Sequence, residues 1–190
     1  MDLIPIRKNT VALTTLAMIA ALGIAVRVFV HIPLIFGVVD LTPGFLFSLL
    51  GGIIGGLPGG VLVGAITGLG GAIAFTEPPL LPMIGNICLG IGAGYGLHLV
   101  RNRDSFKYYL LVIIGAPIIG GFIPTFIISL LYFDPLAIII AAAIADTIQT
   151  LIWVIPALIL ERYIIRPILG HYIYPEPESL DFDELEGEAK

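Results

Sequence analysis

Charged residues are scarce in this chain: 12% of its 190 residues are Asp, Glu, Lys or Arg, whereas 58% are hydrophobic. A soluble domain of this length does not need so much apolar surface, and several apolar runs reach the length needed to cross a membrane. Cysteine occurs once, as Cys88, which excludes an internal disulfide. The chain also has no basic patch, so nucleic acid is not an expected partner.

The motifs of common enzymes are missing as well. The sequence has no H-E-x-x-H, no G-x-S-x-G and no phosphate-binding P-loop, and its glycine-rich stretch at 90–96 does not fit a dinucleotide-binding fingerprint. The three histidines lie in separate parts of the predicted topology and do not converge. We therefore expect a protein that is not an enzyme and that uses neither a cofactor nor a metal ion.

The first long apolar run, residues 9–30, has two distinct faces. At about 1.5 Å per residue it can cross a hydrocarbon core of roughly 30 Å. Ala17, Ala21 and Ala25 recur at a spacing of four and form one stripe of small residues, which favours close contact with another helix. Arg27 lies on another face, where its charge needs a partner or a water-filled cavity.

Further apolar runs follow at about 43–57, 58–75, 81–99, 108–132 and 136–160. Thr42-Pro43 is a typical helix start, Pro58 between glycines predicts a tight turn, and residues 31–41 are expected to form a loop. Glycines at a spacing of four, from Gly52 to Gly68 across the second and third spans and again at Gly90 and Gly94 in the fourth, predict close helix packing within the bundle. The sequence thus predicts an all-α integral membrane protein with six transmembrane helices.

The basic residues of the predicted loops and termini all fall on one side of these six spans: Arg7, Lys8, Arg101, Arg103, Lys107, Arg162 and Arg166. By the positive-inside rule both termini are cytoplasmic, in a multi-pass protein of the plasma membrane. Seven of the fourteen acidic residues lie in the last fifteen positions. We expect residues 1–165 to form the membrane domain and residues 166–190 to form an acidic, disordered cytoplasmic tail.

The sixth span carries a set of polar side chains on one arc of the helix: Asp146, Gln149, Thr150 and Trp153. A carboxylate inside a membrane costs about 2.5–3.5 kcal/mol on insertion scales unless it is paired or hydrated. Asp146 can form an ion pair with Arg27 inside the bundle, or it can face a ligand. The two interpretations are compatible if the pair lines a cavity.

Other polar residues have two interpretations each. Asn86, in the fourth span, can bind a ligand or hold two helices together. His31 is an interface residue or part of a site, and Trp153 packs against lipid or stacks on a flat ligand ring. With residues 31–40 as a lid, we predict a substrate site in the outer half of the bundle, between the first and sixth spans, lined by Arg27, His31, Asp40, Asn86, Asp146, Gln149, Thr150 and Trp153.

Over residues of about 8–165 the chain resembles the S components of energy-coupling factor (ECF) transporters. The resemblance consists of a basic N-terminus, six spans, the alanine stripe in the first span, and the Pro- and Gly-rich passage LTPGFLFSLLGGIIGGLPGGVLVGAITG at 41–68. It implies a subunit that captures a vitamin or related micronutrient at the outer face. It also implies that Ala17, Ala21 and Ala25 contact a transmembrane coupling subunit, which binds two ABC ATPases, and that the chain itself hydrolyses nothing.

Three other functions fit the outline. Structural membrane subunits similar to the rod-shape-determining membrane proteins have the same general form without a ligand. An integral membrane enzyme lacks a catalytic set in this sequence, and a self-sufficient transporter is expected to show an internal repeat. The polar arc of the sixth span and Arg27 in the first favour a substrate-binding subunit, because a scaffold has little reason to keep them.

Overall fold

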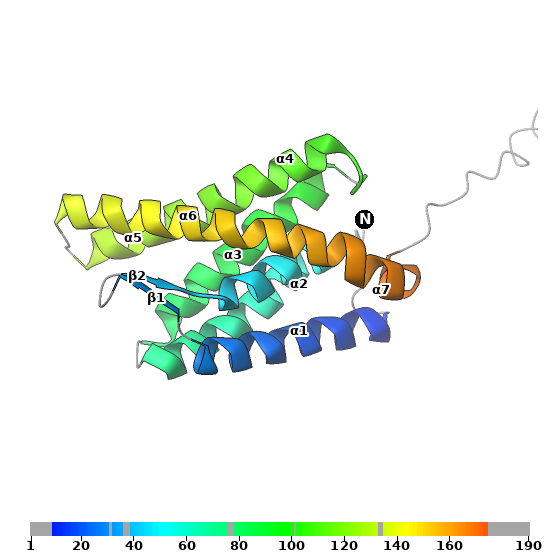
Figure 1. Ribbon diagram of the computed structural model, residues 1–190, viewed down its shortest axis with the longest axis horizontal. Coiled ribbons are helices and arrows are strands. Elements are labelled where there is room, and N and C mark those ends of the chain that lie inside the picture. Colours follow the sequence, from blue (N-terminus) through cyan, green and yellow to red (C-terminus); the bar gives the residue numbers. More distant parts are fainter. Residues whose placement is uncertain are drawn as a thin grey trace, which may run out of the picture.

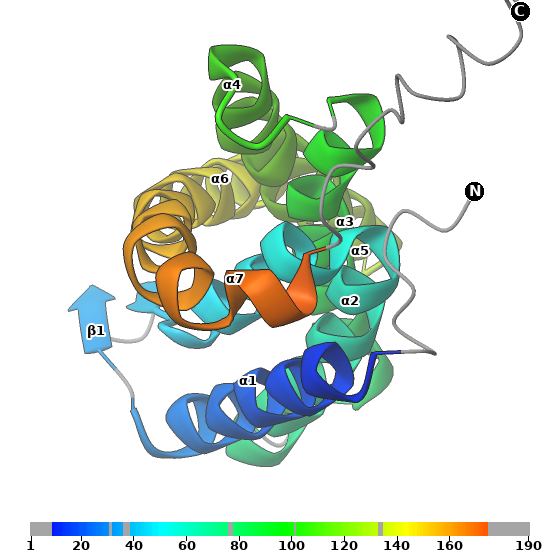
Figure 2. The same cartoon turned by 90° about the vertical axis from the view of Figure 1, so that its right-hand side faces the viewer.

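The computed structural model describes residues 9–30, 32–35, 39–75, 78–100, 102–132 and 135–174. These residues form a bundle of long helices and one short pair of strands (Figures 1 and 2). Five helical stretches are long and apolar enough to cross a membrane: Thr10–Phe29, Gly44–Ala74, Leu80–Leu99, Phe106–Leu131 and Leu136–Ile173. The predicted class, an α-helical membrane protein, is confirmed.

The elements follow one another with short connections. In order they are α1 (Thr10–Phe29), β1 (Ile32–Ile35), β2 (Val39–Leu41), α2 (Gly44–Phe75), α3 (Leu80–Leu99), α4 (Phe106–Gly115), the π-helical η1 (Ala116–Phe122), α5 (Ile123–Leu131), α6 (Leu136–Leu160), the π-helical η2 (Glu161–Ile165) and α7 (Arg166–Ile173). Figure 1 shows β1 and β2 at the left of the bundle and α7 at the right. We call these the hairpin end and the α7 end.

Helix α1 begins where the sequence predicted. The side chain of Asn9 accepts a hydrogen bond from the backbone N–H of Ala12 at 3.1 Å, which satisfies one of the unpaired donors of the first turn. One face of the helix is buried against α2, with Leu16 and Gly23 among its residues. The opposite face is exposed, and α1 therefore forms one side of the molecule (Figure 2).

Helix α2 is broken at Gly56, which has φ 61° and ψ −153°. An L-residue with a side chain rarely adopts this conformation, whereas glycine adopts it freely. The two parts then run antiparallel, since a Cβ added at Gly51 would lie 2.5 Å from the Cβ of Val63. The sequence predicted a turn at Pro58. The reversal is at Gly56, and Pro58 instead lies inside the helix that follows.

The two parts of α2 pack against α3 through glycine. A Cβ added at Gly60 would lie 2.4 Å from the carbonyl carbon of Gly90, and one at Gly64 would lie 2.3 Å from the carbonyl oxygen of Asn86. The two backbones touch with no side chain between them. The close packing predicted from the glycine spacing is confirmed.

The segment predicted as a loop at 31–41 contains an antiparallel hairpin. Ile32 pairs with Leu41 and Pro33 pairs with Asp40. A proline can take part because it lies in a strand of a two-stranded sheet, where one row of backbone groups needs no partner strand. The hairpin connects the end of α1 to the start of α2 at the hairpin end of the bundle (Figure 1).

The last helix continues further than predicted. The sixth span was expected to end near residue 160 and the tail to begin at 166, but η2 and α7 extend the helical path to Ile173. Residues 166–173 are therefore a helix and not part of a disordered tail. The physical reason is that Arg166 is bound by Glu161 and Asp104, which fixes the first turn of α7. Residues 175–190 lie outside the described part of the chain.

Candidate functional site

Three polar side chains from three helices meet at the hairpin end. Nη1 of Arg27 (α1) donates to Oδ1 of Asn86 (α3) at 3.2 Å, and Oγ of Ser48 (α2) donates to the same oxygen at 2.8 Å. Nδ2 of Asn86 donates to the carbonyl oxygen of Pro82 at 2.8 Å. All three side chains are buried. We call Arg27, Ser48 and Asn86 the Arg27 cluster.

Two glycines of α2 provide the space for the Arg27 side chain. A Cβ at Gly44 would lie 3.2 Å from the Cβ and Cδ of Arg27, and a Cβ at Gly71 would lie 2.3 Å from its Nε. The guanidinium carbon also lies 5.7 Å from the centre of the Phe45 ring. A hydrogen bond to a charged group contributes about 1.5–3 kcal/mol, which is similar to the cost of about 2.5–3.5 kcal/mol for inserting an arginine into a membrane.

Gln149 of α6 binds the segment that follows the hairpin. Its Oε1 accepts a hydrogen bond from the backbone N–H of Thr42 at 2.9 Å. Thr42 lies between β2 and α2, so this bond connects the sixth predicted span to the end of the hairpin. Arg27, Asn86 and Gln149 thus lie on three different helices, α1, α3 and α6, which surround the first part of α2.

Asp146 and Thr150 make contacts toward η1 and α5. Oγ1 of Thr125 donates to Oδ2 of Asp146 at 2.5 Å, and Oγ1 of Thr150 donates to the carbonyl oxygen of Asp146 at 2.7 Å. A Cβ at Gly121 would lie 2.9 Å from each of the last two oxygens. Among ion pairs between two described residues, none within 4.0 Å joins Arg27 to Asp146. Thr125 therefore binds the carboxylate, and a ligand contact of Asp146 stays a prediction.

Trp153 is half-buried beside the apolar core. Its Nε1 is buried, and no acceptor among the described residues lies within hydrogen-bond distance. A buried indole N–H usually has a partner. Both roles considered for Trp153, packing and ligand contact, therefore stay predictions.

Two predicted residues of the site remain, His31 and Asp40. His31 lies outside the described residues. The backbone of Asp40 pairs with Pro33 in the hairpin, and its side chain is outside the described part of the structure. These two residues stay predictions.

The alanine stripe lies on the outer surface of the bundle. Ala17, Ala21 and Ala25 are all exposed, whereas Arg27 on the same helix is buried. Small side chains on an exposed face leave the α1 backbone accessible to another helix. The two faces predicted for this helix are therefore separate in the structure.

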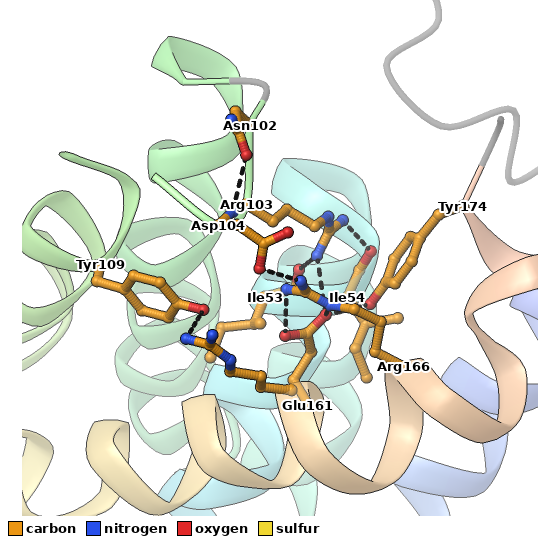
Figure 3. A network of polar contacts seen from close by, with 10 residues as sticks. Ile53, Ile54, Asn102, Arg103, Asp104, Tyr109, Glu161, Arg166 and Tyr174 are labelled. Atoms are coloured by element: carbon orange, nitrogen blue, oxygen red, sulfur yellow. Dashed lines mark hydrogen bonds and ion pairs between the residues drawn. The ribbon is translucent and has the colours of Figure 1, made fainter. Parts of the chain in front are cut away.

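A second polar cluster, which sequence reasoning missed, lies at the α7 end (Figure 3). Arg166 binds both carboxylate oxygens of Glu161, at 3.0 and 2.9 Å, and also contacts Oδ1 of Asp104 at 2.7 Å. The hydroxyl of Tyr174 donates to Oε1 of Glu161 at 2.9 Å, and Nη1 of Arg103 lies 3.7 Å from the same oxygen. Glu161 is fully buried. We call Arg103, Asp104, Glu161, Arg166 and Tyr174 the Glu161 cluster.

Arg103 connects this cluster to the break in α2. Its guanidinium donates to the carbonyl oxygens of Ile53 at 2.5 Å and Ile54 at 3.1 Å. Those carbonyls lack helical donors because Gly56 turns the chain and Pro58 has no N–H. The positive charge at the C-terminal end of a helix is also favourable for its dipole. Arg103 thus caps the first part of α2 from a distant loop.

Tyr174 closes the cluster on the other side. Its ring lies 3.9 Å from the guanidinium carbon of Arg103. Burial raises the pKa of the Tyr174 phenol, and the Glu161 carboxylate raises it further, against the opposite effect of Arg103. The phenol is therefore protonated at neutral pH and donates its hydrogen bond to Glu161.

Two signals in the sequence point to this cluster. Glu161 interrupts a long apolar run and is followed five residues later by Arg166, and Ile54 precedes Pro58 by four residues, so its carbonyl loses its helical donor. A partner for that carbonyl could not be identified from spacing alone. Within the described residues, no group of three His, Cys, Asp or Glu side chains is placed to hold a metal ion.

Comparison with known proteins finds similar three-dimensional structures but no similar sequence family. No protein-family model and no curated protein matches the chain. The solved S component of a bacterial ECF transporter superposes with a TM-score of 0.63 at 20% identity, covering 83% of this chain and 96% of that one. The S component for biotin from an ECF-type ABC transporter gives a TM-score of 0.59 at 19% identity, covering 80% and 90%. The chain therefore has the fold of ECF S components.

Proposed function

We propose that this protein is the substrate-binding membrane subunit of an ECF-type ABC importer, which captures a vitamin or related micronutrient at the outer face of the plasma membrane. The observation that carries the proposal is the fold, which matches a bacterial S component over 83% of the chain and 96% of its counterpart. In this role the chain binds substrate and catalyses no reaction. ATP hydrolysis belongs to two ABC ATPases, which act through a transmembrane coupling subunit.

We infer six spans with both termini in the cytoplasm. The break at Gly56 supports this count, because it divides the apolar stretch of α2 into two antiparallel parts. The α7 end carries Arg103, Lys107, Arg162 and Arg166, whereas the described loops of the hairpin end carry no Lys or Arg. By the positive-inside rule the α7 end faces the cytoplasm and the hairpin end faces outward.

The substrate site is proposed at the hairpin end, around the first part of α2. The Arg27 cluster and Gln149 support this position because they bring buried polar groups from α1, α2, α3 and α6 to one region under the hairpin. Pockets of this kind combine apolar sides with a few placed polar groups. An arginine at this depth suits a substrate with a carboxylate or phosphate. His31, Asp40, Asp146, Thr150 and Trp153 remain proposed members of the site.

The coupling subunit is proposed to bind the exposed face of α1. Ala21→Trp places a large side chain at the centre of the alanine stripe, and we expect it to abolish co-purification with the coupling subunit. Substrate retention, measured by native mass spectrometry of the purified protein, should stay within about two-fold, because Ala21 is exposed whereas the side chains of the Arg27 cluster are buried.

The matched control is Ile148→Trp, which adds the same side chain at an exposed position of α6. It should leave both assembly and substrate retention unchanged. Assembly that survives Ala21→Trp would place the coupling interface elsewhere. If no small molecule co-purifies with the wild-type protein, and no vitamin in a panel raises its melting temperature, the proposed substrate-binding function is wrong.

A further inference from the structure

A shallow groove opens on the surface between α4 and α6, near the α7 end. It is lined by the apolar residues Ile113 of α4 and Ile155, Leu158 and Ile159 of α6, and by Tyr109, Arg162 and Tyr163, which we call its mouth. Its volume is about 170 Å³, below the roughly 300–1,000 Å³ of pockets that enclose a small-molecule ligand. The groove therefore suits a segment of an extended chain and not a whole vitamin.

The charge at the mouth of this groove is not matched by an acid. Arg103 and Arg166 share Glu161, and Arg166 also binds Asp104. Arg162 is exposed, and within the described residues no carboxylate lies within 4.0 Å of it. A guanidinium offers five N–H donors in a planar fork that matches phosphate, and most of these remain free for an anion.

Aromatic residues orient this arginine. Its Nη1 donates to the hydroxyl of Tyr109 at 3.0 Å, which leaves the Tyr109 O–H group able to donate in turn. The guanidinium carbon lies 5.6 Å from the Tyr109 ring and 5.7 Å from the Tyr163 ring. Tyrosine side chains are typical of the level of lipid headgroups, and long basic side chains extend toward that level.

The groove is long enough to accept both a headgroup at its charged mouth and part of an acyl chain along its apolar sides. Ile155 precedes Arg162 by seven residues, so the groove extends about 10 Å from the guanidinium toward the middle of the membrane. The groove is also on the side of the molecule away from α1, as α4 and α1 lie on opposite sides of the bundle (Figure 2). It is thus separate from the proposed coupling face.

We propose that this groove binds one anionic phospholipid of the leaflet at the α7 end. Its phosphate contacts Arg162 and the Tyr109 hydroxyl, and one acyl chain lies along Ile113, Ile155 and Ile159. Basic pockets between transmembrane helices are known to select lipid headgroups by the same combination of charge and apolar contact. The proposal does not depend on the identity of the transported substrate.

The test uses the delipidated full-length protein and native mass spectrometry, with titration of dioleoylphosphatidylglycerol or dioleoylphosphatidylcholine. We expect the wild-type protein to retain the anionic lipid at least five-fold more strongly. Arg162→Gln should remove this preference. Lys107→Gln, which removes an exposed cation at the same end without altering the groove, should preserve it.

A second variant tests the acyl-chain contact without changing any charge. Ile159→Trp fills the groove and should lower retention of both lipids, even if Arg162→Gln fails to fold. Equal retention of the two lipids by the wild-type protein, or equal effects of Arg162→Gln and Lys107→Gln, would overturn the proposal. So would displacement of the lipid by millimolar inorganic phosphate, since the site would then hold an anion without its chain.

Discussion

Arg27 and Glu161 are the two charged side chains that are buried among the described residues, and they lie at opposite ends of the bundle. Glu161 is surrounded by Arg103, Arg166 and the Tyr174 hydroxyl, so its position is determined from three directions. Arg27 donates to the amide oxygen of Asn86, which also accepts a hydrogen bond from Ser48. We therefore assign stability to Glu161, whereas substrate contact by Arg27 stays part of the proposed site.

Glu161→Gln tests the structural role of the Glu161 cluster. The substitution removes the negative charge between two arginines, and breaking a buried ion pair in this way costs about 3 kcal/mol. We expect a fall of several degrees in the melting temperature of the detergent-solubilised protein. Lys107→Gln, at an exposed position of the same end, is the control and should change the melting temperature by less than about one degree. Equal melting temperatures for the two variants would contradict the role given to Glu161.

Asp146→Asn distinguishes a substrate contact from a purely structural carboxylate. If the carboxylate contacts substrate, the variant should bind at least ten-fold more weakly, with a melting temperature close to that of the wild type. Thr125→Val removes the hydroxyl that donates to Asp146 and serves as the comparison. If both variants lower the melting temperature alike and leave substrate retention in native mass spectrometry unchanged, Asp146 acts only within the bundle.

Among the elements, α2 and α3 form the closest pair, because glycine backbones meet directly along their length. This contact predicts unequal effects for two similar substitutions in α3. Gly90→Ala places a Cβ about 2.2 Å from the carbonyl oxygen of Gly60, where the neighbouring atoms are backbone and cannot move aside. We expect a loss of about 2–3 kcal/mol or failure to fold, measured by thermal unfolding in detergent.

Gly85→Ala is the matched control in the same helix, since no atom beyond the surrounding backbone of α3 lies within 4 Å of the added Cβ. It should be neutral or stabilise the protein by about 0.5–1 kcal/mol, because alanine is the better helix former. If the two variants unfold at the same temperature, the result would contradict a direct backbone contact between α2 and α3.

Element positions could be predicted largely from the sequence, because each depends on residues close together in the chain. Asn9 marks the start of α1, and glycine spacing indicates the packing of α2 on α3. The turn was assigned to Pro58 because proline is the stronger signal, whereas the reversal needs the positive φ of Gly56. The hairpin at 32–41 was missed because its two strands have four and three residues, too few for a periodic pattern.

The polar contacts could be predicted only in part. Arg27, Asn86 and Asp146 stand out as polar residues in apolar runs, but their partners depend on how helices rotate about their axes. For Asp146 both an ion pair with Arg27 and a ligand contact were considered, and the hydrogen bond from Thr125 on the neighbouring α5 was not foreseen. Ser48 and Thr125 were not recognised, since serine and threonine are common in membrane helices and carry no distinct signal.

At the scale of the whole molecule, the hairpin end and the α7 end differ in charge. This difference predicts the orientation of the protein across the membrane. Pro78 is exposed at the hairpin end and Asn102 is exposed at the α7 end. In a Cys88→Ala background, Pro78→Cys should react with a membrane-impermeant maleimide in intact cells. Asn102→Cys should react only after permeabilisation. The reverse pattern of labelling would place the α7 end outside the cell.

The capping of α2 by Arg103 also bears on how the chain enters the membrane during synthesis. The apolar stretch of α2 has no polar loop at its break, so a translocon meets about thirty consecutive residues without a charge to mark the reversal. The cation that binds the carbonyl oxygen of Ile53 lies 50 residues further along the chain. Until Arg103 has left the ribosome, the carbonyl oxygens of Ile53 and Ile54 lack the donor that caps them in the folded protein. Capping of the reversal therefore requires that the whole of α3 has already been made.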